Sequence, residues 1–98
     1  MDPTAFRNSL AAESPPAVLS GALQALWWDA KCDWEQAHRS AQQDPTEAGA
    51  AVHAYLHRKE GDLANAAFWY RRAGTEPQAG PIEAEGQRLL AALLNGTG

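Results

Sequence analysis

Hydrophobic residues recur every three or four positions along most of the chain, the spacing that places them on one face of an α-helix. One such stripe precedes residue 31 and is formed by Val18, Leu19, Ala22, Leu23, Leu26 and Trp27. Another lies between residues 47 and 60 and is formed by Ala48, Ala51, Val52, Tyr55 and Leu56. Both runs predict amphipathic helices that bury one face.

Prolines, glycines and small polar residues divide the chain into six segments of helical length. Asp and Ser are favoured N-caps, Pro is favoured at the first helical position, and Gly is favoured just past a helix end. The expected helices run from Pro3 to about Ala12, from Ser14-Pro15-Pro16 to about Lys31, from Asp33 to Asp44, from Pro45 to Gly61, from Asp62 to Gly74, and from Pro81 to Asn95.

The flanking segments have apolar faces of their own. In the first segment Phe6 and Leu10 share one face. In the fifth, the expected inward residues are Leu63, Ala66, Ala67, Tyr70 and Ala73. In the last, the expected anchors are Ile82, Leu89, Leu90, Leu93 and Leu94.

The composition supports helices and excludes sheets. Ala occurs 21 times and Leu 10 times, whereas Val, Ile and Thr together occur seven times among the 98 residues. Ala and Leu are strong helix formers, and strands are rich in the β-branched residues that are scarce here. We therefore expect a single all-α domain covering residues 1–98.

Charge and cysteine content narrow the function classes. Eight basic residues against twelve acidic ones give a net charge of −4, which argues against nucleic-acid binding. The single cysteine forms no internal disulfide and fits a reducing compartment. The first residues lack the pattern of a signal peptide, and the longest uncharged run, residues 14–28, is too short and polar to span a membrane. We expect a cytoplasmic protein without a membrane segment.

An internal sequence repeat relates two segments of the chain at an offset of 29 residues. It aligns Cys32-Asp33-Trp34 with Gly61-Asp62-Leu63, and Trp28 with His57. It also aligns Ala37 with Ala66 and Ala25 with Ala54. Each unit reads as helix, tight turn and helix, and the small alanines would let paired helices approach closely.

The second unit resembles the tetratricopeptide repeat and its Sel1-like relatives. The likeness lies in Gly61-Asp62, in Ala66, and in the segment Phe68-Trp69-Tyr70-Arg71-Arg72-Ala73. It implies a right-handed stack of antiparallel helix pairs, with two pairs in residues 22–77 and capping helices in residues 1–21 and 78–98. The chain also resembles small bacterial proteins that carry the segments WWDAKxDW and VHAYLHRKEGD, which implies a bacterial origin.

A stack of this kind implies a protein or peptide partner. We expect the binding groove to be lined by the first helices of each pair, with the partner contacted by Trp28, His53, His57, Arg58, Trp69 and Arg72. Two pairs leave apolar faces that the capping helices or a second copy of the chain would have to cover, so a homodimer is an alternative.

The candidate residues also have other interpretations. His53 and His57 lie one helical turn apart, a spacing that can bind a metal if His38, Glu60 or another residue supplies a third ligand. The tryptophans are either core residues or exposed anchors. The basic residues near helix ends are either capping charges or a site for an anionic peptide.

Enzyme signatures are absent from the sequence. It holds no glycine-rich phosphate loop and no nucleophile-elbow motif. We expect no catalytic residues and no cofactor, and the primary hypothesis includes no metal site. The primary hypothesis is a protein-interaction module, and the alternative is a small-ligand or metal-binding protein that uses His53 and His57.

Overall fold

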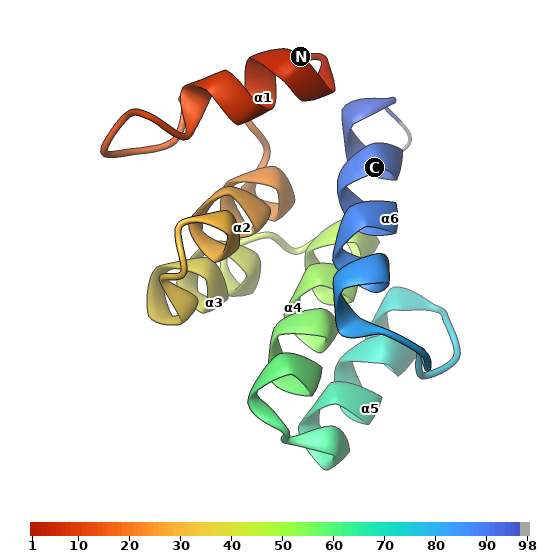
Figure 1. The fold of residues 1–98 in the computed structure, drawn as a ribbon. Coiled ribbons are helices and arrows are strands. Elements are labelled where there is room, and N and C mark those ends of the chain that lie inside the picture. Colours follow the sequence, from red (N-terminus) through yellow and green to blue (C-terminus); the bar gives the residue numbers. More distant parts are fainter. Residues whose placement is uncertain (97–98) are drawn as a thin grey trace.

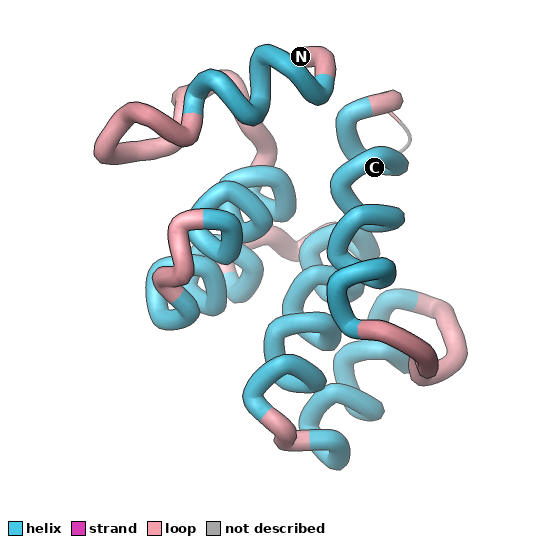
Figure 2. Tube along the Cα trace, viewed as in Figure 1, coloured by secondary structure: helices cyan, strands magenta, loops and turns pink. Residues whose placement is uncertain are grey.

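The computed structural model describes residues 1–96, which form six helices and no strand. The helices are α1 (Pro3–Ser9), α2 (Gly21–Ala30), α3 (Trp34–Gln42), α4 (Glu47–Glu60), α5 (Leu63–Ala73) and α6 (Ile82–Leu94), joined by loops (Figures 1 and 2). The all-α prediction is confirmed. The last two residues of the expected capping segment 78–98 lie outside the described part of the chain.

Side-chain caps define where most of the helices begin. The first five helices each start behind a residue whose side-chain oxygen accepts a backbone N–H of the first turn; these caps are Asp2, Ser20, Asp33, Thr46 and Asp62. Helix α6 starts behind Pro81 without such a hydrogen bond. Because such start signals are local features, five of the six starts were predicted within about two residues.

The start of the second helix was predicted too early. Helix α2 begins at Gly21, where the Ser20 hydroxyl accepts the N–H of Leu23 at 3.2 Å. The Pro15-Pro16 pair lies instead in a connecting segment, because a residue before proline avoids helical geometry. Val18 consequently lies outside any helix and is 83% exposed. Helix α1 also ends earlier than expected, at Ser9.

The chain folds into two helical hairpins, α2–α3 and α4–α5, with equivalent turns. Cys32 and Gly61 both adopt left-handed backbone conformations, with φ of 63° and 90°. Asp33 and Asp62 each donate a backbone N–H to the carbonyl five residues earlier, at 2.9 Å in both turns. The 29-residue sequence repeat therefore corresponds to a repeated local structure. Cys32 itself is exposed rather than buried in its turn.

The four alanines at equivalent positions of the repeat are buried where the paired helices meet. Ala25, Ala37 and Ala54 are fully buried, and Ala66 is 2% exposed. A methyl side chain occupies little space, so neighbouring helix backbones can approach closely at these positions. The abundance of alanine thus contributes to packing within the hairpins as well as to helix propensity.

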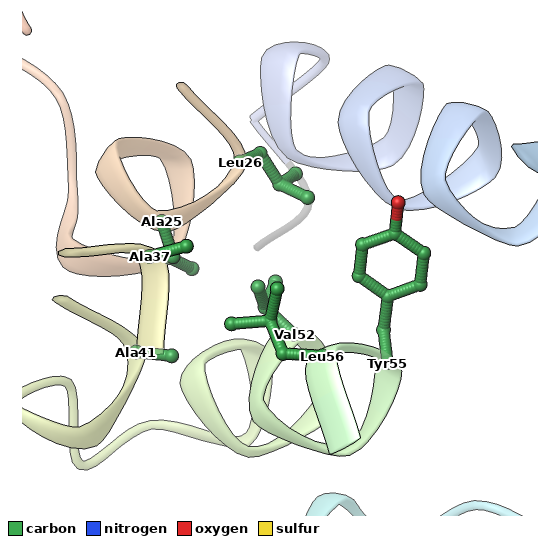
Figure 3. Close-up of a cluster of buried hydrophobic side chains, with 8 residues drawn as sticks. Ala25, Leu26, Ala37, Ala41, Val52, Tyr55 and Leu56 are labelled. Atoms are coloured by element: carbon green, nitrogen blue, oxygen red, sulfur yellow. The ribbon is translucent and has the colours of Figure 1, made fainter. Parts of the chain in front are cut away.

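The main hydrophobic core lies between the two hairpins (Figure 3). Leu26 of α2, Val52 and Leu56 of α4 and the alanines of α2 and α3 pack together there. The Tyr55 ring extends from α4 toward α6, as Figure 3 shows. Helix α6 packs against both α2 and α4, and its apolar side chains cover this core; they are Ile82, Leu89, Leu90 and Leu93.

A smaller core holds the N-terminal segment in place. Phe6 of α1, Leu19 and the fully buried Trp27 pack together, and Leu94 of α6 contacts them. The Trp27 indole N–H donates to the Ser9 hydroxyl at 3.0 Å. Helix α1 thereby lies over the ends of α2 and α6, as in Figure 1.

Asp44 connects the N-termini of α2 and α4. Its Oδ2 accepts the N–H of Ala22 at 2.8 Å, and its Oδ1 accepts the Thr46 N–H at 3.0 Å and the Thr46 hydroxyl at 2.6 Å. Partial burial raises the pKa of this carboxyl, but the hydrogen bonds from Thr46 and Ala22 outweigh it and hold the pKa below its ordinary value. The anionic form is therefore favoured between the two helix starts.

Replacing Gly49 with alanine is expected to destabilise the fold by about 1–2 kcal/mol. A Cβ at Gly49 would press on the Asp44 carbonyl oxygen and lie 2.7 Å from the Asp44 Cβ. This crowding outweighs the gain in helix propensity of about 1 kcal/mol. Urea denaturation measures the change, and the exposed helical substitution Ala64→Gly calibrates propensity without crowding. A Gly49→Ala variant more stable than the parent would contradict the packing described.

The helices that the structure describes are too short, given their polarity, to cross a membrane.

Candidate functional site

The predicted partner-binding residues separate into three groups in the structure. His53, His57 and Trp69 gather with His38 and Trp34 where α3, α4 and α5 meet. Arg58 points instead to α6, and Trp28 packs against the hydrophobic cores on α2. The residues expected to form one surface therefore do not share one.

The three histidines of the chain converge on one point, and we call them the histidine cluster: His38, His53 and His57. Their ring centroids lie 4.5 Å, 4.9 Å and 5.0 Å apart, and one nitrogen from each ring lies within 4.8 Å of the others. His53 and His57 share a face of α4 because they are four residues apart. His38 reaches them from α3, so the cluster joins the two hairpins.

Two tryptophans cover the histidine cluster. The Trp69 indole of α5 stacks on His53 with ring centroids 3.8 Å apart, and the Trp34 indole of α3 stacks on His38 at 4.8 Å. Trp34 is itself fixed, because its Nε1–H donates to the Leu56 carbonyl at 2.9 Å. The stacking restricts rotation of two of the three imidazoles.

Burial disfavours the charged forms of His53 and His38. His53 is 2% exposed, and burial, reinforced by the neighbouring His38 and His57, lowers its pKa to about 4. Burial also lowers the pKa of His38, an effect that His57 increases and Glu60 opposes. At neutral pH His53 and His38 are therefore neutral imidazoles with a free nitrogen lone pair each.

A carboxylate orients the third histidine. Glu60 Oε2 lies 2.7 Å from Nδ1 of His57, one turn along α4. A carboxylate only accepts hydrogen bonds, so the hydrogen of this contact lies on Nδ1 of His57, and in the corresponding neutral tautomer the lone pair is on Nε2. This pairing selects one tautomer of His57.

One buried nitrogen of the cluster has no hydrogen-bond partner. Nδ1 of His53 is the single buried side-chain nitrogen or oxygen without one among the described residues. Buried polar atoms in native proteins are almost always paired, because losing water without a replacement is costly. His53 therefore lies in a place where packing alone does not account for a histidine.

Arg58 belongs to a buried polar network with α6. Its guanidinium contacts Glu85 Oε1 at 2.8 Å and also donates to the Gly80 carbonyl. The Tyr70 hydroxyl of α5 donates to the other Glu85 oxygen at 2.6 Å. Burial and this bond to Glu85 raise the pKa of Tyr70. These contacts pin α6 to the second hairpin and leave Arg58 little freedom to bind a partner.

The expected groove between the first helices of each hairpin is filled. Helix α6 lies against α2 and α4, and Leu89, Leu90 and Leu93 occupy the space where a partner was expected. Trp28 is half-buried there, with its ring against Trp27 at 5.0 Å. The apolar pattern of α6 was read correctly, but nothing local in the sequence indicates which surface the helix covers.

The outer face of α5 is apolar and cationic. Phe68 is 43% exposed, and Arg71 and Arg72, three and four residues later, are also exposed. Leu63, at the opposite end of α5, is 66% exposed. The prediction that Leu63 is an inward residue is wrong: it shares the helical spacing of the buried Ala66 and Tyr70 but, as the first residue of α5, it is exposed. Phe68 contacts the edge of Trp69 at 5.2 Å, and the Arg72 guanidinium lies 5.6 Å from the Trp69 ring centre.

Part of the histidine cluster could be predicted from the sequence. The four-residue spacing of His53 and His57 was identified, and His38 was one of several candidates for a third ligand. The covering role of Trp34 was missed. Its spacing of four from His38 on the same helix was the available signal.

No protein-family model matches the chain, and no match was found among curated proteins or solved structures.

Proposed function

We propose that this protein is an interaction module that binds a protein partner through the outer face of α5. The observation that carries the proposal is the exposure of Phe68 together with Arg71 and Arg72, which lie three and four residues later on a helix whose main packing partner is α4. Solvent-facing residues of a helix are usually polar. An exposed aromatic side chain beside two arginines has the composition of many interface hot spots.

The chemistry of α5 favours an acidic, amphipathic partner. The helix contains no Asp or Glu and ends with Arg71 and Arg72, although the whole chain carries a net charge of −4. Aromatic and arginine side chains dominate the binding energy of many interfaces. Trp69 already contacts both Phe68 and Arg72, so little ordering of these side chains is needed on binding. This surface keeps Trp69 and Arg72 from the residues predicted for the groove.

We further propose that the two hairpins belong to a right-handed, tetratricopeptide-like stack and that the protein acts in a bacterial cytoplasm. The equivalent turns after α2 and α4 support the relationship between the hairpins. The exposed free thiol of Cys32 supports a reducing compartment.

Site-specific photo-crosslinking tests the interaction surface. A photoreactive residue at Phe68 is expected to capture an acidic partner in the cells that make the protein, whereas the same residue at Val18 captures none. Val18 is a matched control because it is even more exposed but lies in a loop near the N-terminus. Binding of the captured partner is expected to weaken at least tenfold with Phe68→Ala and with Arg71→Glu.

Two outcomes would contradict the proposal. Equal capture at both positions would mean that exposure alone explains the crosslinks. Undiminished binding of the partner by Phe68→Ala would place the interface elsewhere. A crosslink to a second copy of the chain would assign the α5 surface to a homodimer, and light scattering at several concentrations would check its stability.

A further inference from the structure

The histidine cluster has the composition and placement of a metal-binding site. All three histidines of the chain are brought together from two helices, although two of them are separated from the third by 15 and 19 residues. Convergence of this kind is not required for packing, because an apolar side chain would fill each buried position without losing hydration. The cluster adjoins the outer face of α5 through Trp69, whose ring stacks on His53, but Phe68 and Arg71 take no part in it.

The unpartnered Nδ1 of His53 is an independent observation that points to a ligand. The atom is buried and has no hydrogen-bond partner, while its side chain is 2% exposed and faces His38 and His57. A neutral imidazole nitrogen offers its lone pair either to a hydrogen-bond donor or to a metal ion. No donor is present at this nitrogen, so a bound cation would satisfy it.

The surroundings of the cluster match the outer shell of a metal site. Histidine ligands commonly donate their second ring N–H to a carboxylate, which fixes the ring and raises its basicity. Glu60 stands in this relation to His57. Stacking by Trp34 and Trp69 holds the other two rings and excludes water from their faces.

The ligand set selects the class of metal. Three imidazoles suit Zn²⁺ and its neighbours among the late first-row transition metals, whereas Mg²⁺ and Ca²⁺ require oxygen ligands. Zn–N bonds of about 2.0–2.1 Å place tetrahedral ligand nitrogens about 3.4 Å apart. The nitrogens of the cluster lie within 4.8 Å of one another, so small ring rotations bring them to binding distance.

We propose that His38, His53 and His57 bind one divalent late transition-metal ion, with Zn²⁺ as the reference ion, and that Glu60 is a positioning residue for His57. Three protein ligands leave a fourth coordination position for water or another small ligand. Because His38 belongs to α3 and the other two ligands to α4, the ion would join the two hairpins.

Isothermal titration calorimetry of the full chain with Zn²⁺ tests the site. After removal of metals by a chelator, we expect one ion per chain at pH 7.5. His38→Leu and His53→Leu are each expected to weaken binding at least 100-fold. Glu60→Gln is expected to weaken it 10–100-fold, as loss of a carboxylate behind a histidine ligand does. Glu35→Gln, which removes an exposed carboxylate from the first turn of α3, is expected to change nothing.

Further readouts separate binding from folding. Circular dichroism of each variant checks that it folds without metal. If His38→Leu does not fold, His38→Gln takes its place, because His38 is half-buried and tolerates a polar side chain. Zn²⁺ is expected to raise the Tm of the parent chain but not that of the histidine variants. Co²⁺ is expected to give visible d–d absorption bands of nitrogen coordination in the parent chain alone.

The proposal is overturned if the parent chain binds Zn²⁺ no more tightly than about 100 µM. It is equally overturned if the parent and His38→Leu bind with the same affinity, since the ion would then lie elsewhere. Neither result would affect docking on α5, because Phe68 and Arg71 take no part in the cluster.

Discussion

Replacing Arg58 with alanine is expected to lower the free energy of unfolding by about 3–5 kcal/mol, the usual effect of breaking a buried ion pair. The Arg58 side chain is 13% exposed and that of Glu85 is 3% exposed. Without Arg58, the Glu85 carboxylate would stay buried with only the Tyr70 hydroxyl as a partner. Urea unfolding followed by circular dichroism at pH 7.5 measures the loss.

Two further variants show whether the buried charge is the cause. The double variant Arg58→Met/Glu85→Gln is expected to recover most of the lost stability, since it leaves no unpaired charge and keeps an acceptor for Tyr70. Arg71→Ala, on the exposed side of α5, is expected to change stability by less than about 0.5 kcal/mol. An Arg58→Ala variant within about 1 kcal/mol of the parent would show that the network does not hold α6.

In the metal-free protein, stability is expected to fall steeply as the pH drops below 6.5. The pKa of His53 is lowered from 6.5 to about 4, so between these pH values His53 is protonated in the unfolded chain but neutral in the folded chain. The stabilisation by neutral His53 is therefore complete above pH 6.5 and is lost progressively toward pH 4. The loss is about 1.4 kcal/mol per pH unit, or about 2 kcal/mol at pH 5.

The groups around His53 shape this response. His38 of α3 adds to it because its pKa is also lowered. His57 and Glu60 of α4 are the other titratable groups at the cluster, and α5 contributes the uncharged Trp69. Urea unfolding with a chelator at pH 7.5 and pH 5.0 measures the effect. His53→Leu is expected to reduce the difference by about 2 kcal/mol, and an unchanged difference would contradict the burial argument.

Helices and their starts were predictable because they depend on neighbouring residues. Asp2, Asp33 and Asp62 each accept a backbone N–H three residues ahead, so their effect is visible in a short window of sequence. The cap of α4 is Thr46 and not the expected Asp44. The start at Ser20 was missed because two signals competed. Ser14-Pro15-Pro16 offered a favourable N-terminus, yet the pattern did not show that the chain must first pack Leu19 against Trp27.

The surfaces were less predictable because they depend on contacts between distant segments. Arg58 and Glu85 are 27 residues apart, and no local sequence pattern predicts their contact. The same holds for α6, whose apolar face was identified but whose position over α2 and α4 was not. The histidine cluster lies between these cases, since its α4 half follows from helical spacing and its α3 half from the packing of two hairpins.

The bonding of Asp44 has a consequence for the cooperativity of unfolding. One carboxylate completes the first turn of α2 and shapes the turn that leads into α4, although Ala22 and Asp44 are 22 residues apart. A fragment that ends before residue 44 would therefore lack a helix-terminal acceptor as well as the second half of its core. Because opening at one helix start removes a hydrogen-bond partner from the other, we expect the two hairpins to unfold together despite their separate turns.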